Sequence, residues 1–352
     1  MSMATSERSV ENLLCENVVC IPGGWKHHSE NSGYDFLAER LRRLGARIEY
    51  PRPHSVFARL IGRLWLESSG LWRKRFSSYY GTSMLLDERR LSSIVKKNSI
   101  IHFLSAENSF SFFRHPNIVC TFHSTLRDRE KYFVNKEAMK RVRAAIALTP
   151  DEAAYLRQEI KDVAVIPSGI NTEAFFPAEG SLLKNPRVLK LLVVGSFWRD
   201  FSALERAVKA NEDKKEVVEF LILGPTEETR RFLSYPHCRV LSRLPYKEYL
   251  DLLQSSDALF LPLLDGAANT AVLEAMACGL PVVTNAGEGP SFYVGDSGWL
   301  YENVEEAIAI LRDPYFKEQC AIRGVKARAR AVEIFSWDKV VPQIVELYRR
   351  VG

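Results

Sequence analysis

The chain has 352 residues, which is too long for one ordinary domain core, so its length predicts two domains. It is 46% hydrophobic and 26% charged, as globular proteins are, and no apolar run approaches the roughly 20 residues of a membrane-spanning helix. The formal charge of +5 is uneven, because residues 1–177 hold 26 Lys and Arg against 19 Asp and Glu. A basic half attracts anionic partners, but no zinc-ligand spacing, RNP-like run or basic zipper supports nucleic acid.

The N-terminal sequence has no basic segment followed by an apolar stretch, so we expect no secretory signal. The six cysteines are scattered without a CxxC pair, which predicts buried, reduced thiols in a cytoplasmic protein. They are Cys15, Cys20, Cys120, Cys238, Cys278 and Cys320.

Short apolar runs alternate with helical patterns through the first half of the chain. A helix is predicted over Ser32–Leu44, with apolar residues at 3-4-3 spacing and Gly45 as its stop. Six strands are predicted at residues 17–21, 47–50, 99–104, 118–122, 144–148 and 163–166. This alternation indicates an α/β fold with a parallel sheet and helices on both faces.

Residues 57–80 depart from this rhythm, because basic and large apolar side chains are mixed along them. Two interpretations stay open. The segment is either an amphipathic helix packed on the first domain, or a surface that meets anionic lipid or a lipid-linked acceptor. The second interpretation places the cytoplasmic protein peripherally at the inner face of the membrane.

A polar break begins at Pro177, after which the strand–helix pattern restarts. Strands are predicted at residues 190–194, 218–223, 239–241, 258–261 and 281–284, and helices at 203–210, 246–254, 270–278 and 304–312. The sequence therefore predicts two doubly wound units joined near residues 178–187. Such units bind ligands outside the carboxyl ends of their strands.

The predicted helix Thr270–Cys278 contains a single charged residue, Glu274. Asn269 is a good N-cap and Gly279 a good C-terminal stop. A carboxylate in so apolar a helix needs a polar partner, because burying it alone costs several kcal/mol. Thr270 lies one turn earlier, at the helix end whose free N–H groups suit a diphosphate. Glu274 then accepts hydrogen bonds from a ribose, although pairing with a neighbouring Arg is an open alternative.

The run LEAMACGLPVV (273–283), followed by NAGEG, resembles the donor-site signature of a known family. This is the retaining GT-B glycosyltransferase family of the "glycosyl transferases group 1" type, which includes mannosyl-, glucosyl- and galactosyltransferases. Residues 166–177, 189–197 and 335–350 resemble its linker, the start of its second domain and its final helix. The resemblance implies two Rossmann-like domains facing across a cleft. Residues 1–178 then form the acceptor domain with 337–352 packed back on it, and 187–336 form the nucleotide-sugar donor domain.

The resemblance assigns Glu274 to the ribose of the donor. The family has an earlier Glu eight residues before it, at the position of Gly266, and Asp265 beside that position is the candidate substitute. The backbone amides of Ala268, Asn269 and Thr270 are implied to hold the phosphates or the sugar.

The family also neutralises the departing diphosphate with a basic pair after a strand-ending glycine. Here Gly195 is followed by Ser196, and Arg199 is the nearest cation. Arg199 is therefore our candidate for that role, with a plain surface cation as the alternative. Since the chain has no DxD motif, we expect neither a metal nor another cofactor.

The resemblance names further candidates at the ends of other strands. His123 is expected to orient the transferred sugar rather than act as nucleophile, with a structural histidine as the alternative. Gly23 and Gly24 resemble the family's glycine loop, although a plain turn stays open. Arg243 and Leu244 are expected near the nucleotide base, and Glu288 is a further candidate.

Together these features predict a metal-independent, retaining hexosyltransferase. It uses a nucleoside-diphosphate sugar and a glycan, lipid or small-molecule acceptor, in cell-envelope or exopolysaccharide biosynthesis. Two alternatives stay open: a degenerate GT-B protein that binds a nucleotide or glycan, and a sugar-nucleotide epimerase. The missing first Glu and the missing Gly-Arg pair favour the former alternative.

Overall fold

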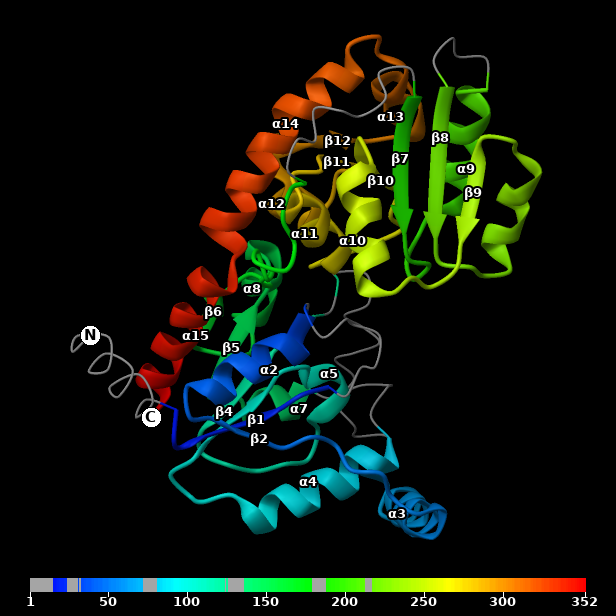
Figure 1. The fold of residues 1–352 in the computed structure, drawn as a ribbon. Helices are drawn as coiled ribbons and strands as arrows, with labels where there is room; N and C mark the ends of the chain where they lie inside the picture. The colour runs from blue at the N-terminus through cyan, green and yellow to red at the C-terminus, as the bar shows by residue number, and fades with distance from the viewer. Residues whose placement is uncertain are drawn as a thin grey trace, which may run out of the picture. The chain divides into compact units, whose positions relative to one another are not determined.

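The computed structural model describes residues 15–23, 31, 33–71, 81–123, 125, 136–178, 188–212 and 217–352. The chain divides into two compact units, Met1–Ser168 with Asp338–Gly352, and Gly169–Trp337 (Figure 1). The division falls earlier than the predicted boundary at residue 178. Ile170 and Phe175 are fully buried in a core of the second unit, which explains why their segment belongs to it.

The first unit contains a six-stranded sheet in the order β2-β1-β3-β4-β5-β6, and every pairing is parallel. Its strands are β1 (Val18–Ile21), β2 (Arg47–Ile48), β3 (Ile100–Phe103), β4 (Ile118–Thr121), β5 (Ala144–Ala147) and β6 (Val163–Val165). Its helices are α2 (Gly33–Arg43), α3 (Val56–Ser68), α4 (Thr82–Ile94), α5 (Ala106–Ser109), α7 (Lys136–Met139), α8 (Pro150–Leu156) and α15 (Trp337–Val351).

The two faces of this first sheet are covered differently, because successive strand residues point to opposite sides. One face packs against α5, α7 and α8. On the other, His102 of β3 reaches Tyr348 of α15, with His102 Nδ1 2.6 Å from the tyrosine oxygen. His102 Nε2 lies 2.8 Å from the Thr121 hydroxyl. The prediction that the final helix packs back on the first domain is therefore confirmed.

The second unit contains a six-stranded parallel sheet in the order β12-β11-β10-β7-β8-β9. Its strands are β7 (Val188–Val194), β8 (Val217–Leu223), β9 (Cys238–Leu241), β10 (Ala258–Leu261), β11 (Val282–Asn285) and β12 (Trp299–Tyr301). Its helices are α9 (Phe201–Ala210), η3 (Glu228–Ser234), α10 (Tyr246–Ser255), α11 (Thr270–Ala277), α12 (Glu288–Val294), η4 (Gly295–Ser297), α13 (Val304–Arg312), α14 (Phe316–Arg330) and η5 (Ala331–Phe335).

The second sheet is buried on both faces, as a doubly wound fold requires. Leu189, Leu191 and Val193 of β7 lie in a cluster with α9 and α13. Leu192, the alternate residue of the same strand, lies in a cluster with α10 and α11. The α/β class and the doubly wound architecture predicted from the sequence are confirmed.

The two ends of the second unit are hydrogen-bonded side by side. The Ile170 N–H donates to the Phe335 carbonyl at 2.8 Å, and the Trp337 N–H donates to the Ile170 carbonyl at 3.2 Å. A Cβ at position 169 would lie 2.3 Å from the Trp337 ring, so only glycine fits there.

Predicted and observed elements agree closely for most strands, and β10 and α13 match to the residue. Strand β12 and helices α4 and α14 were not predicted. All six cysteines are buried, as expected. Among the described residues, no helix combines the length and the apolar character needed to cross a bilayer.

Candidate functional site

Part of the predicted donor set, namely Arg199, Asp265 and the residues that begin α11, follows β7 and β10, the two strands between which the second sheet reverses its strand order. The loops that follow these two strands pair with each other, through an antiparallel bridge between Arg199 and Leu263. The Leu264 N–H donates to the Trp198 carbonyl at 3.0 Å, and the Asp200 N–H donates to the Pro262 carbonyl at 3.0 Å. Ligands of doubly wound sheets bind at such a switch point, outside the carboxyl ends of the strands.

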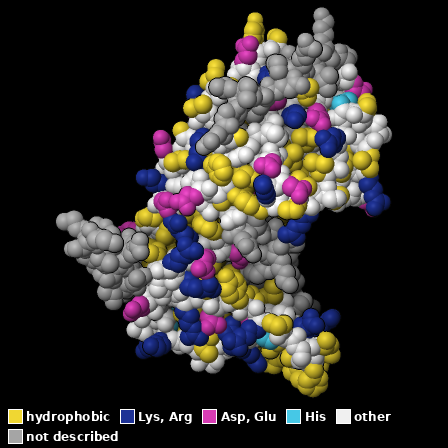
Figure 2. All heavy atoms as spheres, in the orientation of Figure 1, with side chains coloured by type: hydrophobic (Ala, Val, Ile, Leu, Met, Phe, Trp, Pro, Cys, Tyr) yellow, Lys and Arg dark blue, Asp and Glu magenta, His cyan; other side chains and the backbone are white. Residues whose placement is uncertain are grey.

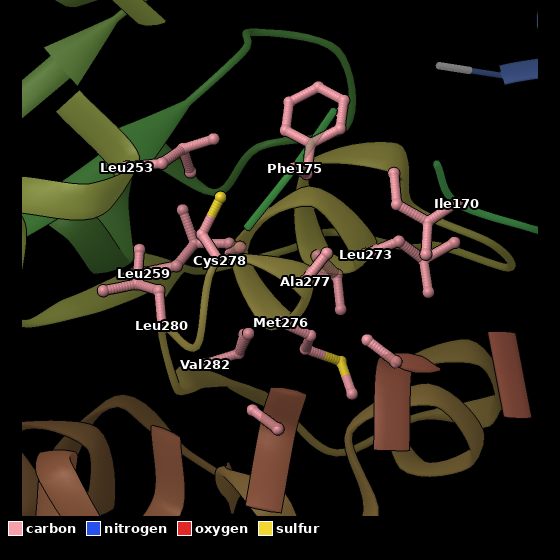
Figure 3. Close-up of a cluster of buried hydrophobic side chains, with 14 of the residues drawn as sticks. Ile170, Phe175, Leu253, Leu259, Leu273, Met276, Ala277, Cys278, Leu280 and Val282 are labelled. Carbon is pink, nitrogen blue, oxygen red and sulfur yellow. The ribbon is translucent and has the colours of Figure 1, made fainter. Parts of the chain in front are cut away.

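Helix α11 is fixed by apolar packing on its inner side. Figure 3 shows Leu273, Met276 and Ala277 of α11 among buried side chains of the neighbouring strands and of the segment before β7. The helix ends at Gly279, whose φ of +70° suits glycine, and the Leu280 N–H returns to the Ala275 carbonyl at 2.9 Å. The position of the helix N-terminus is thus set by the core behind it.

The N-terminus of α11 offers unpaired backbone donors. Asn269 is the N-cap, as predicted, and its side-chain oxygen accepts from the Ala271 N–H at 3.1 Å. Within the part of the chain that the structure describes, the N–H groups of Ala268, Asn269 and Thr270 have no acceptor. All three residues are half-buried. Such donors, together with the helix dipole, favour an anion.

Glu274 lies one turn further into α11 and is only 6% exposed. The Tyr249 hydroxyl of α10 donates to its Oε2 at 2.7 Å. Burial, and next the charge of Glu274, raise the pKa of Tyr249 well above its usual value, so the hydroxyl keeps its proton. The sequence analysis missed Tyr249, because no spacing links residues of two different helices.

Arg199 is a half-buried cation held by carbonyl groups. Its Nε donates to the Val194 carbonyl at 2.8 Å and its Nη1 to the Phe197 carbonyl at 2.9 Å. Burial lowers the pKa of Arg199 to about 10, and the group therefore stays protonated at neutral pH. No carboxylate of the described residues lies within ion-pair distance of it. A desolvated charge without a counter-charge favours an anionic ligand.

Glycines bring the backbone segments of this site close together. Gly195 has a φ of +79°, and a Cβ there would lie 3.2 Å from Arg199 Nη2. Gly289, in the first turn of α12, leaves no room for a side chain, because its Cβ would lie 1.8 Å from the Ala267 carbonyl oxygen. Trp198, beside Arg199, is the only described non-glycine residue with a positive φ, at 56°. Such strain is common in ligand-binding loops.

The remaining candidates of the second unit lie at its surface or are partly buried. Asp265 Oδ1 accepts from the Gly266 N–H at 2.8 Å. Ser196 and Arg243 are exposed, whereas Leu244 and Glu288 are half-buried. Neither Arg243 nor Leu244 has a described contact that supports a role at a nucleotide base.

In the first unit, His123 directly follows β4. Its Nε2 lies 2.8 Å from the Leu104 carbonyl oxygen, so Nε2 carries the proton and donates it. The His123 backbone N–H donates to the Glu107 carboxylate. The ring of Tyr34 packs against the imidazole at a centroid distance of 4.5 Å. With Nε2 as the donor, Nδ1 is the acceptor of the neutral tautomer, an arrangement that fits the orientation of a ligand hydroxyl.

Gly23 is described and half-buried after β1, whereas Gly24 lies outside the described residues. A cavity of about 270 Å³ lies beside the carboxyl ends of β10 and β11, and none of the predicted site residues lines it. Its walls come from the start of α9, the ends of β10 and β11, and the β12–α13 connection. The described residues contain no group of three or more His, Cys, Asp and Glu placed to hold a metal.

The comparisons with known proteins concern mainly the second unit. A family model described as "Glycosyl transferases group 1" matches residues 189–312, from β7 to the end of α13. An MMP alpha-(1->4)-mannosyltransferase of Mycolicibacterium hassiacum is 28% identical over 198 residues, which are 53% of this chain and 48% of that protein. A phosphatidyl-myo-inositol mannosyltransferase of Mycobacterium leprae is 29% identical over 211 residues, 54% of each chain. This chain thus spans about half the length of the curated relatives that it matches.

Among solved structures, a sucrose-phosphate synthase from Thermosynechococcus elongatus superposes with a TM-score of 0.68. The alignment covers 95% of this chain and 99% of that chain at 17% identity. At this identity the likeness concerns the fold, and it extends over both sheets.

Proposed function

We propose that this chain, which belongs to the glycosyl transferases group 1 and has their GT-B fold, is a retaining glycosyltransferase. In this proposal it moves a hexose-type sugar from a nucleoside-diphosphate sugar to an acceptor hydroxyl. The observation that carries the proposal is Arg199, a desolvated cation that pairs with no carboxylate of the described residues. It lies at the same switch point as the N–H groups at the start of α11, for which the described part of the chain offers no acceptor.

The first requirement of the reaction is stabilisation of the leaving group. Negative charge develops on the departing diphosphate as its bond to the sugar breaks. Arg199 and the N–H groups of Asn269 and Thr270 are fixed donors, so they stabilise that charge without reorganising. The acceptor hydroxyl attacks the anomeric carbon on the face from which the diphosphate departs, and its proton passes to an oxygen of the departing diphosphate. The sugar passes through an oxocarbenium-like transition state. The configuration at the anomeric carbon is therefore retained.

The second requirement is recognition of the nucleotide. Glu274 lies on α11, one turn beyond the N–H groups that donate to the diphosphate. There its carboxylate can accept hydrogen bonds from the ribose hydroxyls. The hydrogen bond from Tyr249 fixes the Glu274 side chain in one orientation. A fixed acceptor loses less conformational entropy on binding than a mobile one.

Asp265 of the second unit is assigned to the transferred sugar, and His123 is proposed as the sugar-orienting group that the first unit supplies. His123 presents Nδ1 as an acceptor for a sugar hydroxyl, because the Leu104 carbonyl holds the Nε2 proton. Asp265 stands beside Gly266, where the family resemblance implies a glutamate. Asp265 is shorter than that glutamate and stands one position earlier in the chain, so it contacts the sugar differently. We assign the enzyme's choice among hexoses to this difference.

The acceptor class is proposed from the relatives. The Mycobacterium leprae relative is named for a phosphatidyl-myo-inositol acceptor. For this chain we propose a glycan or lipid-linked acceptor, in cell-envelope or exopolysaccharide biosynthesis.

The test is a thermal-shift panel with UDP, GDP, ADP and their common sugars. One nucleotide class should stabilise the protein, by about 2.7 kcal/mol at a hundred times its Kd. The Arg199→Gln variant should bind that nucleotide about tenfold or more weakly, because it loses a charged contact to the diphosphate. Arg230→Gln is the matched control, since Arg230 is an exposed arginine of the same unit.

Two results would contradict the proposal. One is a panel in which no nucleotide shifts the melting temperature, or in which Arg199→Gln binds like the unmodified protein. The other is binding with neither release of nucleoside diphosphate nor transfer to any acceptor. That second result would identify a degenerate GT-B binding protein.

A further inference from the structure

We propose that the outward face of α3 docks the protein on an anionic lipid bilayer. The starting observation is a concentration of exposed apolar side chains on this helix. Sixteen large hydrophobic residues are exposed in the described part of the chain, and six of them lie on α3. They are Val56, Phe57, Leu60, Ile61, Leu64 and Trp65.

These side chains are prominently exposed for their size. Phe57 is 73% exposed, Leu64 65% and Leu60 54%. Single exposed apolar residues are ordinary on protein surfaces, but a contiguous group marks an interaction site. In Figure 2, hydrophobic side chains gather at the lower right, where Figure 1 places α3.

The orientation of α3 is fixed, because the face opposite its exposed apolar side chains packs against α4. Leu66 is fully buried beside Leu85 of α4. A Cβ at Gly62 would lie 2.4 Å from the Thr82 methyl group, so glycine lets α3 and α4 approach closely. The Ser55 hydroxyl caps the helix by accepting from the Ala58 N–H at 3.2 Å. The apolar face is therefore held outward by the fold.

Basic side chains flank the apolar face, which selects an anionic occupant. Arg59 and Arg63 are exposed, and Arg63 forms an ion pair with Glu67 of the same helix at 2.9 Å. The Arg89 guanidinium of α4 lies 4.4 Å from the centre of the Trp65 ring. Residues 51–71 and 81–97 together carry seven Lys and Arg against three Asp and Glu. An amphipathic helix with this pattern lies in the membrane interface, with its apolar face among the acyl chains and its arginines at the head groups.

A bilayer explains both features better than a protein partner does. The exposed aliphatic and aromatic residues recur on successive turns of one helix, and exposed arginines occur along the same helix. Each arginine near an anionic surface contributes roughly a fivefold gain in affinity, and salt weakens it. The docking test contains neither a sugar donor nor an acceptor. Its outcome is therefore independent of whether the proposed sugar transfer is correct.

The experiment is flotation of the full chain with vesicles of phosphatidylcholine alone or mixed with phosphatidylglycerol. The unmodified protein should bind the anionic vesicles about tenfold or more tightly than the neutral ones, and less tightly at high salt. Phe57→Ser combined with Leu64→Ser should reduce that binding about tenfold or more. Arg59→Gln combined with Arg63→Gln should remove most of the preference for anionic lipid.

The matched control is Ile322→Ser combined with Val325→Ser on α14, whose side chains are 65% and 73% exposed. This control should float like the unmodified protein. Absence of binding to anionic vesicles would overturn the proposal, as would equal binding by the Phe57/Leu64 variant. A lipid-free dimer that this variant dissociates would also overturn it, because the face would then be an interface between copies of the chain.

Discussion

Each unit contains a buried ionisable side chain that pairs with a tyrosine hydroxyl, and the two pairs differ in what surrounds them. In the first unit, His102 is fully buried, and Tyr348 and Thr121 occupy both ring nitrogens. In the second unit, Glu274 is paired with Tyr249, one turn from backbone donors that have no described acceptor. Both ring nitrogens of His102 already have hydrogen-bond partners, so His102 needs no ligand and is a structural group. Glu274 lies beside N–H groups without a described acceptor, which is what we expect of a ligand-binding group.

The largest effect should come from Glu274→Ala. Removing the carboxylate eliminates a charged acceptor for the ribose and leaves the Tyr249 hydroxyl without its partner. We expect donor hydrolysis or transfer to fall about a hundredfold or more in kcat/KM. Glu248→Ala is the control, because Glu248 is exposed on α10 and should leave the rate unchanged. Equal rates for both variants would show that Glu274 is as structural as His102.

The second effect concerns His102 and pH. Burial, and next the nearby His123, lower the pKa of His102 from 6.5 to about 3, so the native protein holds this ring neutral. The unfolded chain binds a proton below about pH 6.5, and stability is therefore lost as the pH falls from there toward 3. Between pH 7 and pH 5 this linkage should remove about 2 kcal/mol of unfolding free energy.

Denaturant titrations at several pH values measure that loss. The His102→Asn variant should show a shallower pH dependence, although it is less stable at pH 7. An identical pH slope in the variant and the unmodified protein would contradict the assignment of a neutral buried histidine.

The smallest effect comes from a matched pair of tyrosine variants. Tyr249→Phe should lower kcat/KM about tenfold, because Glu274 loses the donor that orients it. Tyr348→Phe should cost about 1 kcal/mol of stability with activity nearly unchanged, because it removes a hydrogen bond from the structural network. Kinetics and unfolding measured on both variants test whether the two tyrosines differ in role. The same pattern of losses in both would erase the distinction.

Local chemistry made part of the donor site predictable from the sequence. Asn269 and Gly279 were identified because capping depends on one residue and its immediate neighbours. Glu274 was identified because a charge in an apolar helix is conspicuous. Tyr249 was not, since its contact with Glu274 depends on the packing of α10 against α11, which no residue spacing encodes.

The same limit applies to the first unit. The mixed pattern of residues 57–80 left two interpretations open, an amphipathic helix packed on the first domain or a surface that meets lipid; residues 72–80 of that range lie outside the described residues. The pattern did not decide which way the apolar side of α3 faces, because apolar faces usually point to the core. The inward face depends instead on Gly62 and Leu66, two residues that a hydrophobicity pattern scarcely distinguishes.

The hydrogen bonds between Ile170 and residues 335–337 have a consequence for how the chain is organised. They make residues 169–337 a module whose entry and exit points coincide, as in a domain inserted into a host. The ends of such a module are already together, so the module can form its own core without waiting for the surrounding sequence to hold them. The contact between Gly169 and the Trp337 ring then holds the two ends of that insertion together, and a side chain at position 169 would separate them.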